Sequence, residues 1–243
     1  MVIKMVSIII PVLNEGKNIK AFLTMLEKVK GKKEIIFVDG ESTDNTVSTV
    51  RKCAKVLSSE RGRARQMNEG AEYARGNILW FLHADSIVDP NSIGYIEKAI
   101  EEDEIIGGGF SLYFYDCNTL FMRYISTTSN IRAGKLGIYF GDQGMFIRKD
   151  VFEKLGGYAD IDIMEDLEIS LRLRKIGKMK LLRYGIGTSA RRFKKSGPIK
   201  THILMHKLRI LYFLGVSSEK LNEMYRRSMD ECTHTYDKST YSR

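Results

Sequence analysis

Short apolar stretches alternate with helical patterns three times along the N-terminal part of this chain. The stretches lie within MVSIIIPVLNE, KEIIFVDGESTDNT and NILWFLHADS, and each of them ends in polar side chains. Continuous apolar strands joined by helices are typical of a parallel sheet that is covered on both faces. The alternation therefore predicts an α/β fold with a mostly parallel central sheet and helices on both sides of it.

Apolar side chains at helical spacing mark the three connecting helices. The first helix is expected at about residues 18–30, and the third at about residues 91–102. The second is expected to follow an N-cap at Asp44 or Ser42 and to run on to Val56. Helices of this kind are the usual crossovers between parallel strands.

Polar residues close each of the three predicted strands. Asn14 and Glu15 follow the first strand, Asp39 closes the second, and the third ends in His83 and Asp85. Ligands of open α/β sheets bind beyond the carboxyl ends of the strands. These side chains are therefore expected to gather at one edge of the sheet.

The regular alternation ends at about residue 107. GGGFSLYFY indicates a more exposed strand, and GIYFGDQGMFIRKDVFEKLGGY indicates a strand, a loop and a short helix. No internal repeat or low-complexity linker divides the sequence. We expect one catalytic domain at residues 1–195, a helical extension at 196–227 and a polar tail at 228–243.

The composition fits a globular protein in a reducing compartment. With 243 residues and 43% hydrophobic content, the chain can bury a core. No run approaches the roughly 18 apolar residues of a membrane span, and we expect no signal peptide. The three cysteines, Cys53, Cys117 and Cys232, have neither metal-site nor disulfide-framework spacing, which favours the cytosol.

The net charge of +9 is concentrated toward the C-terminus. Residues 171–227 contain 16 Lys and Arg against two Glu, whereas residues 1–170 contain 21 against 25 acids. The basic segment suits an anionic lipid surface, a nucleic acid or a phosphorylated ligand, or else it is a solvated helix face.

The stretch SERGRARQMNEGAEYARG indicates a phosphate contact. It combines closely spaced arginines with Asn68 and Gly70 at an apparent helix start. Arginine forks and helix N-termini both favour phosphate oxygens, which points to Arg63 and Asn68. The sequence G-x-x-x-x-G-K-[ST] is absent, so this is no P-loop. The alternative is a basic loop that faces solvent.

Five motifs in series resemble those of the family 2 inverting glycosyltransferases with the GT-A fold. They are SIIIPVLNE, IIFVDGESTDNT, FLHADS, GDQGMFIRK and MEDLEISLRLRKIG, and the resemblance covers roughly residues 5–195. A GRARQMNEGA-like segment ahead of a HAD triplet is similar to a small soluble subgroup of that family. The resemblance implies a Rossmann-like GT-A domain that binds a nucleoside diphosphate sugar.

In that family, residues after the first two strands contact the nucleoside. The resemblance thus implies donor contacts by Pro11, Asn14, Glu15 and Asp39, and an ionised carboxylate suits a base N–H or a ribose hydroxyl. The alternatives are that Asp39 only forms a turn and that Asp44 only caps a helix.

The HAD triplet, His83, Ala84 and Asp85, takes the place of the family's metal-binding Asp-x-Asp. The resemblance implies that Asp85 ligates Mn²⁺ or Mg²⁺ on the diphosphate. A neutral imidazole at His83 would suit Mn²⁺ better than Mg²⁺, although the first residue of the family's triplet often contacts ribose instead of the metal. A histidine whose polar atoms are simply satisfied in the core is the competing interpretation.

The resemblance also assigns the acceptor side of the site. The aspartate of the family's ED pair is the catalytic base, which implies Asp166, with Glu165 positioning it or the acceptor. Acids at a helix start also complement the helix dipole, so a structural role is the alternative. The motif GDQG is expected to line the acceptor side, unless it is only a tight turn; its residues are Gly141, Asp142, Gln143 and Gly144.

The segment SARRFKKSG partly matches the family's Q-x-x-R-W motif, with serine for glutamine and phenylalanine for tryptophan. It implies a phosphate contact by Arg191 or Arg192.

Further on, residues 198–227 indicate a basic amphipathic helix with Ile199, Ile203, Leu204, Leu208 and Leu211 on one face. Such a helix either lies in a membrane interface or packs on the catalytic domain or a second subunit.

The combined prediction is a metal-dependent inverting glycosyltransferase. It would move a hexose from a nucleoside diphosphate sugar, expected to be UDP-linked, to an acceptor hydroxyl such as that of a lipid or polyprenyl phosphate. We expect a cytoplasmic protein, at the inner face of the membrane if residues 198–227 touch lipid, and no nucleic-acid partner. The alternatives are a sugar-nucleotide nucleotidyltransferase and a non-enzymatic basic binding protein.

Overall fold

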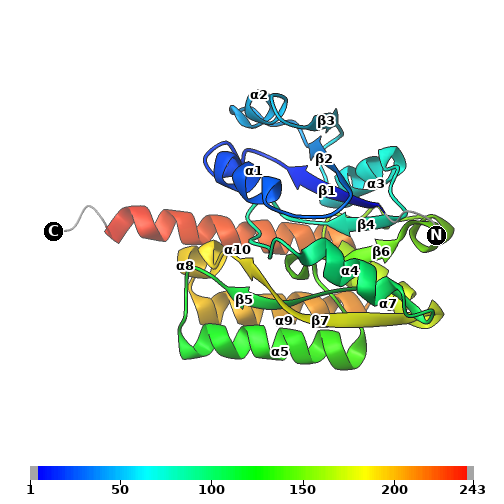
Figure 1. Ribbon diagram of the computed structural model, residues 1–243. Helices are drawn as coiled ribbons and strands as arrows, with labels where there is room; N and C mark the ends of the chain where they lie inside the picture. Colours follow the sequence, from blue (N-terminus) through cyan, green and yellow to red (C-terminus); the bar gives the residue numbers. More distant parts are fainter. Residues whose placement is uncertain (1–4, 240–243) are drawn as a thin grey trace.

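The computed structural model describes the backbone of residues 5–239 and the side chains of residues 5–228. A seven-stranded sheet forms its centre, in the order β3-β2-β1-β4-β6-β5-β7 (Figure 1). Each neighbouring pair is parallel except the two that involve β6. The strands are β1 (Val6–Val12), β2 (Lys33–Asp39), β3 (Lys55–Ser58), β4 (Ile78–Phe81), β5 (Ile105–Phe114), β6 (Phe146–Arg148) and β7 (Lys178–Thr188).

Helices connect these strands and extend the chain at its C-terminal end. Over the first six strands they are α1 (Ile19–Glu27), α2 (Thr46–Val50), α3 (Arg63–Tyr73), α4 (Ser92–Ile100), α5 (Leu120–Leu136) and the 3₁₀ helix η1 (Gly141–Gln143). The later ones are α6 (Lys149–Lys154), α7 (Glu165–Ile176), α8 (Arg191–Ser196), α9 (Pro198–Phe213) and α10 (Ser218–Ser239).

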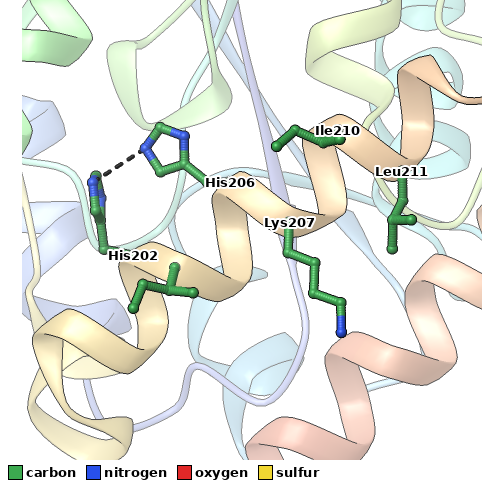
Figure 2. A pocket seen from close by; sticks show the side chains of 6 residues that line it. His202, His206, Lys207, Ile210 and Leu211 are labelled. Atoms are coloured by element: carbon green, nitrogen blue, oxygen red, sulfur yellow. Dashed lines mark hydrogen bonds between the residues drawn. The ribbon is translucent and has the colours of Figure 1, made fainter.

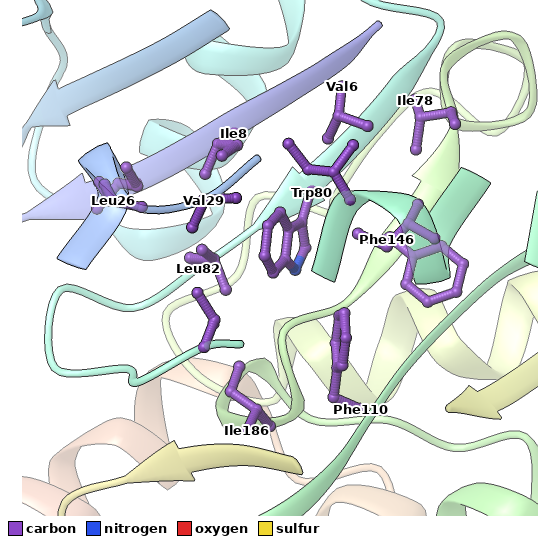
Figure 3. Close-up of a cluster of buried hydrophobic side chains, with 14 of the residues drawn as sticks. Val6, Ile8, Leu26, Val29, Ile78, Trp80, Leu82, Phe110, Phe146 and Ile186 are labelled. Atoms are coloured by element: carbon purple, nitrogen blue, oxygen red, sulfur yellow. The ribbon is translucent and has the colours of Figure 1, made fainter. Parts of the chain in front are cut away.

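Two apolar layers cover the two faces of the sheet. On one face α1 and α4 pack around Trp80 of β4, together with Phe110 and Phe146 from the neighbouring strands (Figure 3). On the other face α3, α6 and α7 pack on the opposite side chains of β1, β2 and β4. Helices therefore lie on both faces of a mostly parallel sheet, and the predicted fold class is confirmed.

The C-terminal helices close one side of the domain. Leu208 of α9 and Leu221 of α10 are fully buried against Leu167 of α7 and the segment that leads to η1. Of the alternatives that the sequence left open for this extension, packing on the catalytic domain occurs. The prediction that α9 has a single apolar face is wrong. Leu208 faces inward, whereas Ile199 and Ile203 are exposed, so α9 is apolar on two sides.

Two boundaries in the first half differ from those predicted. The second helix ends at Val50, and Val56 belongs instead to β3, a short edge strand that pairs with β2. Helix α3 starts at Arg63, not near Asn68, because Gly62 just before it has φ 148°, a conformation open mainly to glycine. The helix therefore begins within the arginine cluster.

The second half departs further from its prediction. Strand β5 is mostly buried, since it lies between β6 and β7. The strand expected before GDQG does not form, and this segment leads directly into η1. Helix α10 continues through the expected polar tail to Ser239; residues 240–243 lie outside the described range.

No helix in the described part of the chain is long and apolar enough to cross a membrane. Cys53 and Cys117 are free thiols, as expected, and the side chain of Cys232 is outside the described residues.

Candidate active site

The loops after β1 and β2 are joined by hydrogen bonds at the carboxyl edge of the sheet. The backbone N–H of Asn14 donates to Ser42 Oγ (2.9 Å), and Thr43 N–H donates to Asn14 Oδ1 (2.8 Å). Ser42 N–H in turn donates to Asp39 Oδ2 (3.0 Å), while Asp39 Oδ1 is buried with no partner among the described residues. Asp39 is thus held through Oδ2, while Oδ1 is available to a ligand.

Asp44 fixes Glu15 and the start of α2 in the same region. Its carboxylate accepts the backbone N–H of Gly16 (2.9 Å) and both the N–H and the hydroxyl of Thr46. The Thr46 hydroxyl also accepts the N–H of Glu15 (2.8 Å). These bonds, those from Thr46 first, lower the pKa of Asp44. The N-cap of α2 is Asn45, so the predicted N-cap at Asp44 or Ser42 is wrong by position; Asp44 instead accepts from Thr46, the first residue of α2, and shapes the loop that bears Glu15.

Gln66 of α3 ties β1 to β2 just below these loops. Its buried amide nitrogen donates to the carbonyl of Val12 (2.9 Å) and to the carbonyl of Val38 (2.8 Å). Gln66 lies inside the GRARQMNEGA segment, where its mid-helix position gave no sign of this contact. These two hydrogen bonds fix the ends of β1 and β2, next to Asn14 and Asp39.

Arg191 joins the first loop to the HAD segment. Its guanidinium lies 2.9 Å from Glu15 Oε1 and 3.4 Å from Asp85 Oδ2. Burial raises the pKa of Asp85, and the charge of Arg191 opposes that rise. The sequence predicted a phosphate contact by Arg191 or Arg192, and that contact stays a prediction. In the structure Arg191 contacts the carboxylates of Glu15 and Asp85, whereas the guanidinium of Arg192 lies over the ring of Tyr225, 5.5 Å from its centre.

Helix α8 is anchored so that both arginines lie near the site. Asp116 accepts the hydroxyl of Ser189 (2.9 Å) and the backbone N–H of Ala190 (2.7 Å). Phe193, which takes the place of the family's tryptophan, packs edge-on against Phe114 at 5.5 Å. Phe193 is therefore part of the support of α8.

His83 lies between the nucleotide side and the acceptor side. Ala84 is buried in the core beneath it, and His83 Nε2 is buried with no partner among the described side chains. Burial, followed by the charges of nearby arginines, lowers the pKa of His83 well below its usual value. The imidazole is therefore neutral, and its free nitrogen is consistent with a ligand position and not with a satisfied core histidine.

Asp166 opens α7 and faces Gly141 of η1. Gly141 N–H donates to Asp166 Oδ2 (2.8 Å), while Asp166 Oδ1 is buried without a partner in the described part of the chain. Burial, reinforced by the charge of Glu165, raises the pKa of Asp166 to about 7. Glu165 pairs with Arg63 of α3 (3.2 Å). Met164, just before them, has a left-handed backbone (φ 72°), and strained positions of this kind gather at functional sites.

A side chain at position 141 would touch both His83 and Asp166. A Cβ built on Gly141 would lie 2.5 Å from His83 Nε2 and 2.8 Å from Asp166 Oδ2. These two atoms are therefore no more than about 5.3 Å apart. Only glycine leaves this space open, so a ligand could approach the GDQG backbone closely at this position.

The rest of GDQG mainly supports the turn. Gln143 is fully buried, accepts from Arg132 (2.8 Å) and donates to the Phe110 carbonyl (3.4 Å). The Gly144 carbonyl accepts from Trp80 (3.1 Å). Asp142 differs, because its buried Oδ1 has no partner among the described residues, and burial raises its pKa. Of these four residues, Gly141 and Asp142 remain available to a ligand.

Two other predicted donor residues are occupied or apolar. The amide of Asn68 lies within α3 and exchanges two hydrogen bonds with the backbone of Tyr158, at 2.8 and 2.9 Å. Pro11 lies inside β1, opposite Val38. Asn68 thus supports the loop after α6 and is left out of the donor site that we propose.

An unbroken chain of contacts joins the three predicted acids. It runs from Asp39 through Ser42 to the Asn14–Glu15 loop, then through Arg191 to Asp85. From the HAD segment it passes through His83 and Gly141 to Asp166. The strand-end residues therefore lie at one edge of the sheet, as predicted.

The residues present could hold a divalent ion only together with a substrate. No group of three or more His, Cys, Asp or Glu among the described residues is arranged to bind a metal. His83 nevertheless has a buried Nε2 without a partner among the described residues, and the carboxylate of Asp85, 3.4 Å from Arg191, is a hard oxygen donor two residues away in the chain. Mg²⁺-type sites commonly use one or two protein ligands and take the others from substrate phosphates and water. The donor set therefore fits a metal that arrives with a diphosphate.

The fold and site define the chain as a glycosyltransferase domain of the GT-A class. Residues 7–156 match the family model of glycosyl transferase family 2, so the chain belongs to that family. This match confirms the family that the sequence motifs indicated. It also favours sugar transfer over the nucleotidyltransferase alternative.

Curated relatives are named as glycosyltransferases and are longer than this chain. A probable glycosyltransferase, YdaM of Bacillus subtilis, is 24% identical over 198 residues, which cover 71% of this chain and 47% of YdaM. Glycosyltransferase AglE of Haloferax volcanii is 26% identical over 173 residues, or 64% of this chain and 56% of AglE. The chain thus spans about half the length of these relatives.

A solved structure with the same fold is that of the mannosyltransferase PcManGT from Pyrobaculum calidifontis, in complex with GDP-Man and Mn²⁺. It has a TM-score of 0.65 and 17% identity, and the match covers 98% of this chain and 75% of PcManGT. S. aureus TarS 1-349 in complex with UDP-GlcNAc has a TM-score of 0.57 and 17% identity, over 76% of this chain and 58% of TarS. At this identity, the likeness shows the fold alone.

Proposed function

We propose that the chain transfers a sugar from a nucleoside diphosphate sugar to an acceptor hydroxyl with inversion at the anomeric carbon. The observation that carries this proposal is the placement of Asp85 and His83 between Asp39 and Asp166 along one sheet edge. A donor that spanned this edge would have its nucleoside at Asp39 and its anomeric carbon toward Asp166.

On the donor side, the free oxygen of Asp39 is proposed to accept a hydrogen bond from the base or the ribose. Arg191 would exchange part of its contact with Glu15 and Asp85 for the diphosphate, because a guanidinium fork matches phosphate oxygens. Two solved neighbours are bound to UDP-GlcNAc and to GDP-Man, which supports a nucleotide-sugar donor. We propose a uridine nucleotide.

Asp85 and His83 are the residues proposed to hold Mn²⁺ or Mg²⁺. When bound, such an ion acts as a Lewis acid that stabilises the negative charge of the departing diphosphate. His83 suits this role because it is kept neutral and its Nε2 has no other partner among the described residues. Asp85 contributes the hard oxygen and the negative charge.

Asp166 is proposed as the general base. The acceptor oxygen would attack the anomeric carbon opposite the diphosphate and pass its proton to Asp166 Oδ1, while the glycosidic bond breaks and its electron pair leaves with the diphosphate. A pKa near 7 keeps the carboxylate basic enough to take that proton at neutral pH. Glu165 and Arg63 would hold the start of α7 in place.

The stereochemistry of donor hydrolysis tests this proposal without knowledge of the acceptor. With water as a slow acceptor and Mn²⁺ present, NMR should show an α-linked UDP-hexose giving the β-anomer of the free sugar first. Asp166→Asn should suppress this release. An α-anomer as first product would contradict inversion, and release that Asp166→Asn leaves unchanged would contradict the role of the base.

A further inference from the structure

Exposed apolar side chains gather on α5 and α9. Each is at least half exposed, and two reach 84% (Leu120) and 74% (Leu214). The set comprises Leu120, Tyr124, Ile131 and Leu136 of α5, Ile199, Ile203, Ile210 and Phe213 of α9, and Leu214 just after α9. We call this set the α5–α9 surface. Apolar patches of this kind mark interaction sites.

The two helices meet near their N-terminal ends. The ring of His202 on α9 lies 5.6 Å from Phe121 and 5.9 Å from Tyr124 on α5, measured between ring centres. Both helices lie on the same outer side of the domain (Figure 1). The α9 residues Ile199, Ile203 and Ile210 follow each other at spacings of four and seven, which places them on one side of a helix.

A shallow hollow of about 380 Å³ lies in the α9 part of this surface. It is lined by His202, Ile203, His206, Lys207, Ile210 and Leu211, and the two imidazoles face each other at 3.1 Å between their Nε2 atoms (Figure 2). Burial, followed by the charge of Arg209, lowers the pKa of both histidines. Near pH 7 the positive charge on this side therefore comes from lysine and arginine.

The charged residues of the two helices themselves are all of one sign. Helices α5 and α9 contain no Asp or Glu, and their basic residues are Arg123, Arg132, Lys135, Lys200, Lys207 and Arg209. Helix α8, just before α9, adds the exposed Lys195, whereas its Lys194 is paired with Asp116 at 3.1 Å. A second copy of the chain would bring like charges together, which opposes self-association through this face. An anionic partner with an apolar interior would match both the exposed apolar side chains and the basic residues of this surface.

We propose that the α5–α9 surface docks on a membrane rich in anionic lipid, with both helices parallel to the bilayer plane. Apolar side chains would enter the headgroup and acyl boundary, and exposed basic residues such as Arg123, Lys135 and Lys207 would contact lipid phosphates. The surface is wider than residues 198–227, because α5 supplies part of it.

This surface also lies next to the acceptor side of the proposed active site. The guanidinium groups of Arg132 on α5 and Arg209 on α9 lie 3.9 and 5.5 Å from the ring centre of Phe140, which directly precedes η1. A docked domain would thus hold its acceptor side near the bilayer. The docking itself does not rest on the proposed sugar transfer.

Co-sedimentation of the full chain with vesicles tests the proposal. We expect binding to vesicles of phosphatidylcholine with 30–40% phosphatidylglycerol (roughly the anionic content that gives a strong surface potential). Binding should be at least about tenfold weaker to pure phosphatidylcholine, and it should weaken with added salt. Ile203→Glu and Ile210→Glu should each lower the affinity about tenfold or more, without a change in Tm, because both side chains are exposed.

Tyr73→Glu on α3 is the matched control, since it adds the same charge at another exposed apolar position. It should bind vesicles almost like the parent chain. Equal weakening by Tyr73→Glu, equal binding to both vesicle types, or dimers in light scattering that Ile210→Glu dissociates would overturn the proposal. UDP binding with Mn²⁺, measured on the same variants, should not change, so failure of the docking surface is distinct from failure of the proposed catalysis.

Discussion

Gly141 holds only one side of the Asp166 carboxylate. The backbone N–H of Gly141 donates to Asp166 Oδ2 over 2.8 Å, and Oδ1 is buried with no partner among the described residues. An unpaired buried carboxylate oxygen is costly, so its persistence points to a ligand that completes it. We propose that this ligand is the acceptor hydroxyl.

Asp166→Asn should abolish most of the transfer activity while it keeps the fold. The amide oxygen of asparagine can still accept the N–H of Gly141, but the side chain can no longer take a proton. We expect a loss of about 10²–10⁴-fold in kcat, the usual contribution of a general base. Donor binding should stay close to that of the parent chain, as a UDP titration would show.

The rate should depend on pH through the ionisation of Asp166. Because the pKa of this acid is raised to about 7, it is protonated and inactive as a base below that pH. Activity is therefore expected to rise with pH and to level off above about 7. A profile that is already flat from pH 5 would exclude Asp166 as the group that controls the rate.

The raised pKa of Asp166 also predicts that stability falls with rising pH, whereas activity rises. The folded-state pKa is above the ordinary value of 3.8, so ionisation of Asp166 destabilises the fold increasingly from pH 4 to pH 7. Asp166→Asn should thus be more stable than the parent chain at pH 8, by an amount on the order of 1 kcal/mol or more. Near pH 4 the two should unfold alike. Urea unfolding at both pH values measures the difference.

Gly141→Ala should impair the site because its methyl group has no space. The Cβ would lie 2.5 Å from His83 Nε2 and 2.8 Å from Asp166 Oδ2. We expect a destabilisation of about 1–3 kcal/mol and weaker binding of UDP with Mn²⁺. Gly94→Ala in α4 is the control, since nothing lies within 4 Å of a Cβ there, and alanine should stabilise that helix slightly.

Gln66→Leu should loosen the ends of β1 and β2. The change leaves the carbonyls of Val12 and Val38 without their donor, at about 1–3 kcal/mol for each buried group. Nucleotide binding should weaken as well, because Asn14 and Asp39 follow these carbonyls. Glu72→Leu, at an exposed position of the same helix, should change the unfolding free energy by less than about 0.5 kcal/mol. A similar loss in both variants would refute the special role of Gln66.

The sheet edge could be predicted from the sequence because strand ends carry a strong signal. The apolar runs before Asn14, Asp39 and His83 are short but uninterrupted, and parallel topology then brings their ends together. Strand β3 lacks that signal. It is a short, half-exposed edge strand, and Val56 suits either a helix or a strand until its pairing with β2 is known.

Long-range side-chain contacts set the rest of the site. The choice between Arg191 and Arg192 depends on where α8 begins, which Asp116 fixes from far away in the sequence. The sequence predicted a phosphate contact by Asn68 because it indicated a helix start near this residue. Helix α3 in fact begins five residues earlier, at Arg63. Local patterns contain neither fact, since both depend on which loops meet in three dimensions.

The central claim is that Asp85 and His83 bind a metal only together with the donor diphosphate. Electron paramagnetic resonance of Mn²⁺ tests it most directly, because bound Mn²⁺ loses the sharp signal of the free ion. With the parent chain, UDP should cause a loss of free signal beyond that from UDP alone, and Asp85→Asn should abolish this extra loss. Equal Mn²⁺ uptake by Asp85→Asn, or no uptake with any nucleoside diphosphate, would contradict the account.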